Sequence, residues 1–213
     1  MFIELSEFLR CPEPHGETFC VVAPDEMVGR MVTRGVVGCP TCRREYRIAD
    51  GVVEFGLAEA AGAGEGEQGR AGGMPDPDVV QALLGLGGPG GFVVLVGTVA
   101  RLADALAERL GGVHFVGINP PPGVSVSPAL SLLVHPERIP LRSAMARGVV
   151  LGAECATPSW IAEGTRVLLQ GLRLVVVAEQ VTAPGLERMA VGRGLWVGQK
   201  VGERGAGSGK RRS

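Results

Sequence analysis

The sequence has few aromatic residues and no excess of charge of either sign. Aromatic residues make up 4% of the 213 residues, so Val, Leu and Ala must fill any core. The chain has 21 lysines and arginines against 22 aspartates and glutamates. This balance leaves no global field to attract nucleic acid or a membrane surface. The hydrophobic fraction of 46% is nevertheless sufficient for a buried interior.

The chain also lacks long apolar runs and the pattern of a signal peptide. Its longest runs, such as residues 92–96 and 174–178, are far shorter than the ~18 residues needed to span a bilayer. Glu4 and Glu7 interrupt the first apolar stretches, which is not typical of a signal peptide. Five cysteines, an odd number with two in a Cys-x-x-Cys, indicate reduced thiols and metal rather than disulfides. We therefore expect a soluble cytoplasmic protein with no membrane partner.

Two candidate metal-binding knuckles lie near the N-terminus. The first offers Cys11 and His15, and the second offers Cys39 and Cys42 in a Cys-Pro-Thr-Cys turn. Such a turn directs two thiolates at one point, and the other knuckle completes a tetrahedron. Four protein ligands leave no open position for water, so the expected Zn²⁺ is structural. Cys20 is the competing fourth ligand, but its apolar neighbours favour a buried strand cysteine.

The metal is expected to form the core of a zinc-ribbon domain over residues 1–55. This segment has little apolar mass, and metal binding is worth roughly 10 to 16 kcal/mol in small zinc domains. Residues 56–75 are crowded with glycine and lack periodicity, which predicts a flexible linker. We expect the two halves that it joins to unfold independently. Residues 202–213 are also rich in glycine and predict a disordered basic tail.

Residues 76–201 show strand patterns that alternate with helix patterns. Asp76 with the proline after it predicts a helix start, and residues 100–110 carry one apolar helical stripe. Residues 159–170 predict another helix. Five apolar runs have the length of buried strands: residues 92–96, 113–118, 130–134, 149–151 and 172–178. Residues 186–190 and 195–201 predict a closing antiparallel hairpin. This alternation favours an α/β domain with a mostly parallel sheet covered on both faces.

The N-terminal motifs resemble those of a known family. Cys11-Pro12, the Cys39-to-Cys42 turn and the later Asp50-Gly51 are similar to the small zinc-binding activator subunit of tRNA, ribosomal-RNA and release-factor methyltransferases. The resemblance covers roughly residues 3–55 and implies a zinc ribbon that docks on another protein, with a methyltransferase among the candidates. Pro14 stands where the family has a thiol, and His15, one residue later, can supply an imidazole instead.

Residues 76–201 resemble a Rossmann-like, S-adenosylmethionine-dependent methyltransferase domain. The order of elements fits, and residues 162–176 are similar to that family's helix, turn and fifth strand. The resemblance implies a nucleoside cofactor at the carboxyl ends of the first strands. If the domain is active, Gly97, Thr98 and Asn119 are the cofactor-binding residues.

Those positions depart from the family's pattern. Only Gly97 follows the first strand, and Thr98 and Val99 come where backbone must approach the ligand. Asn119 replaces the carboxylate that grips the ribose, and charged hydrogen bonds contribute about 1.5 to 3 kcal/mol each. We therefore expect no binding of S-adenosylmethionine, with Val99 and the prolines 120–122 filling the crevice.

Other candidate residues favour structural interpretations. Cys155 has no neighbouring base or cation in the sequence to lower its pKa, so a small buried side chain is favoured over a nucleophile. The glycine-rich residues 87–91 lie before the first strand, on the wrong side for a phosphate loop. Arg43, Arg44 and Arg47 form a basic strip that is commonly a solvated face, although RNA or an acidic partner are candidates.

The sequence therefore favours a pseudoenzyme, with no catalytic residue assigned. It predicts a non-catalytic zinc-binding scaffold or regulatory partner that carries a degenerate methyltransferase-like domain and acts through protein–protein interaction. One alternative is an active S-adenosylmethionine-dependent methyltransferase with an atypical cofactor pocket. Another is a nucleic-acid-binding module, which the near-neutral charge does not favour.

Overall fold

The computed structural model describes residues 1–56, the N-terminal segment, and residues 73–202, the C-terminal segment. The predicted linker and tail fall almost entirely outside these ranges, so both stay predictions. In the described ranges, every helix is too short or too polar to cross a bilayer.

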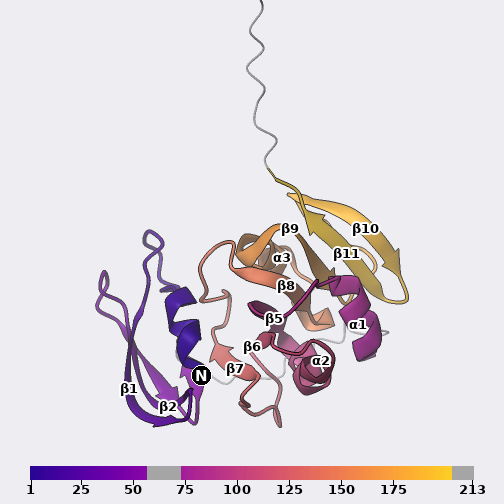
Figure 1. The fold of residues 1–213 in the computed structure, drawn as a ribbon. Coiled ribbons are helices and arrows are strands. Elements are labelled where there is room, and N and C mark those ends of the chain that lie inside the picture. The colour runs from indigo at the N-terminus through magenta and orange to yellow at the C-terminus, as the bar shows by residue number, and fades with distance from the viewer. Residues whose placement is uncertain (57–72, 203–213) are drawn as a thin grey trace, which may run out of the picture.

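All strands of the described residues join one sheet (Figure 1). In chain order they are β1 (Val21–Val28), β2 (Met31–Gly38), β3 (Glu45–Ala49), β4 (Val52–Glu54), β5 (Phe92–Val96), β6 (His114–Ile118), β7 (Leu130–Val134), β8 (Ala146–Leu151), β9 (Leu168–Val176), β10 (Leu186–Gly192) and β11 (Leu195–Lys200). Their spatial order is β1-β2-β3-β4-β7-β6-β5-β8-β9-β11-β10. The central strands from β4 to β9 run parallel, and antiparallel strands extend the sheet at both ends. The predicted α/β class, with a mostly parallel central sheet and a C-terminal antiparallel hairpin, is confirmed.

The helices are short. They are η1 (Ile3–Phe8), α1 (Pro77–Leu84), η2 (Gly97–Leu102), α2 (Ala103–Arg109), η3 (Ala153–Cys155) and α3 (Pro158–Val167), where η marks a 3₁₀ helix. Helix α1 begins as predicted, because the Asp76 carboxylate accepts a 2.7 Å hydrogen bond from the backbone N–H of Asp78. Helix α3 ends earlier than predicted. The Lys200 ammonium donates to the carbonyls of Thr165 and Leu168, which satisfies this helix end and lets β9 begin at once.

The sheet buries a separate cluster of side chains on each face. Because side chains alternate along a strand, Val93 and Leu95 of β5 pack on the face covered by α1 and α2. Phe92, Val94 and Val96 of the same strand pack on the opposite face, together with residues of α3. The continuous apolar run that predicted β5 therefore reflects burial on both sides.

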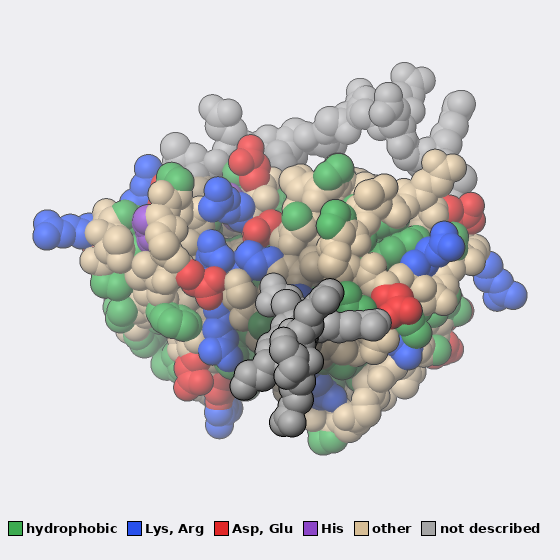
Figure 2. Space-filling view, turned by 90° about the horizontal axis from the view of Figure 1, so that it is seen from above, with side chains coloured by type: hydrophobic (Ala, Val, Ile, Leu, Met, Phe, Trp, Pro, Cys, Tyr) green, Lys and Arg blue, Asp and Glu red, His purple; other side chains and the backbone are tan. Residues whose placement is uncertain are grey.

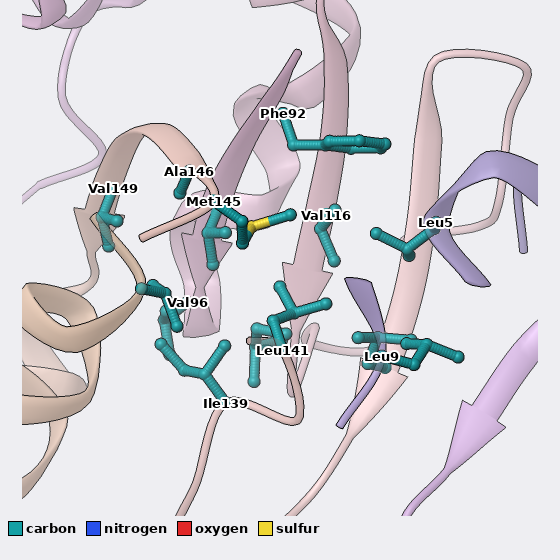
Figure 3. Packing of buried hydrophobic residues seen from close by; sticks show 14 of the residues in the cluster. Leu5, Leu9, Phe92, Val96, Val116, Ile139, Leu141, Met145, Ala146 and Val149 are labelled. Carbon is teal, nitrogen blue, oxygen red and sulfur yellow. The ribbon is translucent and has the colours of Figure 1, made fainter. Parts of the chain in front are cut away.

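The N-terminal segment covers the part of the second face that has no helix of its own. The connections between β6 and β7 (residues 119–129) and between β7 and β8 (residues 135–145) contain no helix. Leu5 and Leu9 are fully buried and pack in the same cluster as Val116 of β6 (Figure 3). The N-terminal segment thus occupies the place that a crossover helix usually takes in a parallel sheet.

Backbone pairing also joins the two segments. Strand β4 runs parallel to β7, with Val52 opposite Leu132 and Val53 opposite Leu133. One sheet and one buried cluster therefore contain residues of both segments, which argues against the predicted independent unfolding of the two halves. The physical reason is that an unpaired strand edge needs a partner, which periodicity within one segment does not reveal. The domain boundaries themselves stay a prediction.

Candidate functional site

The structure brings the four predicted metal ligands together. One ligand atom each from Cys11, His15, Cys39 and Cys42 lies within 4.8 Å of all the others. The sulfur atoms of Cys11 and Cys42 are 3.7 Å apart, and Cys39 Sγ lies 3.5 Å from His15 Nε2. Zinc–sulfur bonds of about 2.3 Å in a tetrahedron separate two sulfurs by about 3.8 Å. The donor set therefore fits one tetrahedral zinc ion.

Backbone hydrogen bonds shape both knuckles. In the second, Arg43 N donates to the Cys39 carbonyl and Cys39 N donates to the Arg44 carbonyl, both at 2.9 Å. Arg43 has a φ of 59°, a left-handed conformation that closes this turn. In the first, Cys11 N donates to the carbonyl of Thr18 at 3.0 Å. Backbone hydrogen bonds within the two knuckles thus position the candidate metal ligands.

Two further groups orient the ligands. His15 Nδ1 lies 2.8 Å from the Gly16 carbonyl and carries the proton in that bond, which leaves Nε2 free to face Cys39. The Tyr46 hydroxyl lies 3.2 Å from Cys11 Sγ and can donate to a thiolate. Hydrogen bonds of this kind orient the side chains that bind a metal without contacting the metal themselves.

The thiols differ in acidity without a metal. Burial raises the pKa of Cys11 to about 11. Burial also opposes the thiolate of Cys39, but hydrogen bonds from the backbone of Cys42 and Thr41 outweigh it and lower that pKa to about 7. Burial raises the pKa of Cys20 to about 12, and its sulfur is not part of the cluster. The geometry therefore favours the predicted set over one that contains Cys20.

A strap from the C-terminal segment, residues 136–143, holds the first knuckle. The Arg138 guanidinium donates to the carbonyl of Pro12, next to a ligand, at 3.0 Å. Arg10 N donates to the carbonyl of Pro140 at 3.1 Å. These bonds connect the metal cluster to residues more than 120 positions later in the chain.

Helix α3 anchors the strap from its other side. The Arg166 guanidinium donates to the carbonyls of Ile139 and Leu141, each at 2.7 Å, and pairs with Glu163 at 2.8 Å. Burial opposes the charge of Glu163, but Arg166 outweighs it and lowers the pKa of that carboxyl. The metal cluster is therefore linked to α3 through a network of charged hydrogen bonds.

A second candidate site lies where the strand order reverses, between β5 and β8. In doubly wound sheets this switch point forms the ligand crevice. Here the carboxylate of Glu154, in η3 after β8, accepts hydrogen bonds from the backbone N–H of Thr98 and, at 3.1 Å, from its hydroxyl. A Cβ added to Gly152 would lie 2.7 Å from this carboxylate, and one on Gly97 would collide with it. The side chain of Glu154, which is itself exposed, therefore lies against Gly97.

Asn119 is committed to the backbone. Its Nδ2 donates to the His135 carbonyl at 2.7 Å, and its Oδ1 accepts from His135 N at 2.9 Å. The pair joins the carboxyl ends of β6 and β7 and holds Asn119 at a φ of 50°. The side chain is therefore turned toward the next strand rather than toward a ribose.

Glu154, and not the residues that the sequence predicted, lies beside Gly97. Val99 is 1% exposed and belongs to the buried cluster that contains residues of α1 and α2. Pro122 lines a separate cleft of about 450 Å³ beside Arg101. Val99 and Pro122 therefore lie elsewhere than predicted, while the places of Pro120 and Pro121 stay predictions. Sequence reasoning missed the role of Glu154 because 56 residues separate it from its partner, and no local pattern signals the contact.

Cys155 has the environment of a structural residue. It is buried beside Glu154, and burial raises its pKa to about 12. A thiol of this kind is almost fully protonated at neutral pH and is a poor nucleophile. No catalytic role is assigned to it.

The glycine-rich loop of residues 87–91 surrounds the positively charged side chain of Arg147 and does not have the form of a phosphate-binding loop. The Arg147 guanidinium donates to the carbonyls of four consecutive residues, Gly87 to Gly90. A phosphate cradle needs N–H groups pointing inward, whereas this loop turns carbonyl oxygens inward. The arrangement agrees with its expected role as a structural loop.

The predicted basic strip gives little support to nucleic-acid binding. Arg44 pairs with Glu13 at 3.0 Å, while Arg43 and Arg47 are exposed. On the face seen in Figure 2, basic and acidic side chains lie next to one another. Such mixing does not produce the single-sign patch typical of a nucleic-acid surface.

Comparison with known proteins finds a distant likeness of fold. No family model and no curated protein matches the sequence. A similar solved structure is the antibiotic-resistance methyltransferase Kmr (14% identity, TM-score 0.43, covering 63% of this chain and 97% of that chain). Another is a complex between the Haloferax volcanii Trm112 methyltransferase activator and a putative methyltransferase (14%, 0.45, 58% and 89%). A third is a SAM-dependent methyltransferase from Aquifex aeolicus (17%, 0.44, 59% and 88%). Activity does not follow from likeness at this level.

Proposed function

We propose that this protein is a non-catalytic scaffold or regulatory partner, in which a structural zinc ribbon is built into a degenerate methyltransferase-like sheet. The observation that carries the proposal is the pairing of Asn119 with the backbone of His135. This side chain stands where a ribose-binding group is needed, and two hydrogen bonds hold it in a structural role. A cofactor would have to break both bonds to use it.

Zinc has a structural role in this proposal. Cys11, His15, Cys39 and Cys42 would hold it, and four protein ligands leave no position for a substrate or a reactive water. The ion would cross-link the two knuckles and so fix the segment that covers β6 and β7. Zinc of this kind contributes to folding and not to chemistry.

In this proposal the zinc ribbon packs against the sheet of its own chain. The edge of β4 is already paired with β7, so it is not available to another protein. A protein partner, a methyltransferase among them, would need a different surface, and β1 and β10 are the strands at the two edges of the sheet. Strand edges present unpaired backbone groups that can accept a further strand.

Titration calorimetry with S-adenosylmethionine on the zinc-loaded full chain tests the proposal that the protein is non-catalytic. We expect no binding heat at ordinary ligand concentrations. The Asn119→Asp variant should also stay silent, because a carboxylate addresses only the ribose while Glu154 still lies against Gly97. Micromolar binding by the unaltered chain would overturn the proposal and favour an active methyltransferase with an atypical pocket.

Elemental analysis of single alanine variants tests the ligand set. We expect one zinc per chain, lost in His15→Ala and retained in the matched Cys20→Ala, because only the first side chain belongs to the cluster. The opposite result would show that Cys20 is the fourth ligand.

A further inference from the structure

The three thiols among the candidate zinc ligands differ in their exposure to solvent. Cys42 is exposed, whereas Cys11 and Cys39 are only 1% and 3% exposed. An oxidant in solution therefore meets the sulfur of Cys42 first. Oxidation of a cysteine requires access and thiolate character, and a zinc ion keeps its thiol ligands in the thiolate form. Cys42 is thus the sulfur of the cluster that is open to chemical modification.

A thiol of the other knuckle lies close to Cys42. Its sulfur and that of Cys11 are 3.7 Å apart, so they must approach by about 1.7 Å to reach the disulfide length of about 2.05 Å. Cys39 Sγ instead faces His15 Nε2 at 3.5 Å and accepts hydrogen bonds from the backbone of its own turn. Because these contacts hold the sulfur of Cys39 in place, Cys11 is the partner that an oxidised Cys42 meets.

We propose that Cys42 is an oxidation site and that its oxidation joins it to Cys11, so that a disulfide replaces zinc as the link between the two knuckles. The inference rests on the proposed function, in which zinc forms that link, and adds a covalent modification of the same cluster. With hydrogen peroxide, the Cys42 thiolate attacks one peroxide oxygen, which gives a sulfenic acid and releases hydroxide. The Cys11 thiolate then attacks the sulfur of Cys42, the S–S bond forms and a second hydroxide leaves. Two thiolates thereby lose two electrons to one peroxide.

This disulfide would remove the zinc and still keep the ribbon in shape. Of the four candidate ligands only His15 and Cys39 would remain, and a structural zinc site needs four. The new bond would close a loop between residues 31 positions apart, and such a cross-link stabilises a fold by restricting the unfolded chain. We therefore expect the N-terminal segment to stay packed on β6 and β7 in the oxidised, metal-free protein.

Peptide mapping of the zinc-loaded full chain after treatment with hydrogen peroxide locates the disulfide. Trypsin cuts after arginine, so Cys39 and Cys42 fall in one peptide, residues 35–43. Cys11 falls in another peptide, residues 11–30. We expect these two peptides to be joined and one zinc per chain to be released to a colorimetric chelator. A thiol reductant with added zinc should reverse both changes.

Three matched variants assign the bond to its cysteines. Cys20→Ser leaves Cys11 as the one cysteine of its peptide and should give the same joined product. Cys155→Ser removes a buried thiol outside the cluster and should also change nothing. Cys42→Ser should give no joined peptides at the same peroxide concentration, because the exposed sulfur is missing. Joined peptides in Cys42→Ser would overturn the inference.

Thermal unfolding measures whether the link between the knuckles survives. We expect the oxidised, metal-free chain to unfold about 5 to 15 °C above the reduced chain treated with a chelator. Equal midpoints, a disulfide confined to residues 35–43, or a sulfinic acid at Cys42 without a disulfide would each overturn the inference. A chain that holds no zinc before oxidation and still joins Cys42 to Cys11 would contradict the proposed role of zinc and support this pair, so the two failures are distinguishable.

Discussion

The two faces of the parallel sheet are covered in different ways. On one face, α1 and α2 come from the segment that also supplies the strands they cover. The other face is covered by α3 and by the N-terminal segment, which packs on β6 and β7 although it is distant from them in the sequence (Figure 3). The first face therefore depends on local packing, whereas the second depends on a segment whose own shape we expect to require zinc.

Removal of zinc should have the largest effect. We expect a chelator to destabilise the second face as well as the ribbon, because Leu5 and Leu9 then lose the frame that holds them over β6. Structural zinc is worth roughly 10 to 16 kcal/mol in small domains. Differential scanning calorimetry should show one shared transition that moves down in temperature. Two transitions, with the C-terminal one unmoved by the chelator, would restore the picture of independent halves.

One truncation on each face sharpens the comparison. Leu5→Ala on the ribbon-covered face and Leu84→Ala on the α1 face each remove a fully buried side chain, at a cost of about 2 to 5 kcal/mol. In zinc-free protein, the cost of Leu5→Ala should largely vanish because its segment is already undocked. Leu84→Ala should keep its full cost. Urea unfolding with and without chelator measures this difference, and equal zinc dependence in both variants would contradict it.

Acid should also act on the ribbon-covered face first. Burial lowers the pKa of His114 from 6.5 to about 4, and its ring stacks on Phe2 with centroids 4.4 Å apart. A depressed pKa means that this contribution is complete above pH 6.5 and is lost as the pH falls from 6.5 to 4. The loss amounts to about 3 kcal/mol. Denaturant unfolding across this range should show a steeper decline for the unaltered chain than for His114→Gln, and parallel curves would contradict the assignment.

The smallest effect concerns the loop that precedes β5. Arg147→Ala should cost about 1.5 to 3 kcal/mol, because the loop of residues 87–91 loses the guanidinium that gathers its carbonyls. Arg147→Lys should recover only part of that loss, since one ammonium cannot reach all four carbonyls. Urea unfolding measures both. Because Arg147 and the loop that it holds both belong to the C-terminal segment, we expect the cost to change little when zinc is removed.

Local chemistry was enough to predict some features. The cap at Asp76, the apolar runs of β5 and β7, and the spacing of the two knuckles each depend on neighbouring residues, and the structure places them as expected. Strand β2 mixes polar and apolar residues and was not predicted. The pairing of β4 with β7 and the contact of Glu154 with Thr98 join distant residues, so a single sequence carries no pattern for them.

The parallel pairing of β4 with β7 also has a consequence in time. Val52 pairs with Leu132, which a ribosome adds 80 residues later, or about 4 to 16 seconds at 5 to 20 residues per second. Throughout that interval the edge of β4 has no partner, and Leu5 and Leu9 have no surface to cover. We expect a newly made ribbon to bind its metal before the rest of the sheet exists. The knuckles would then set the order in which the chain assembles, by keeping its first strands in shape until the strand that receives them has been synthesised.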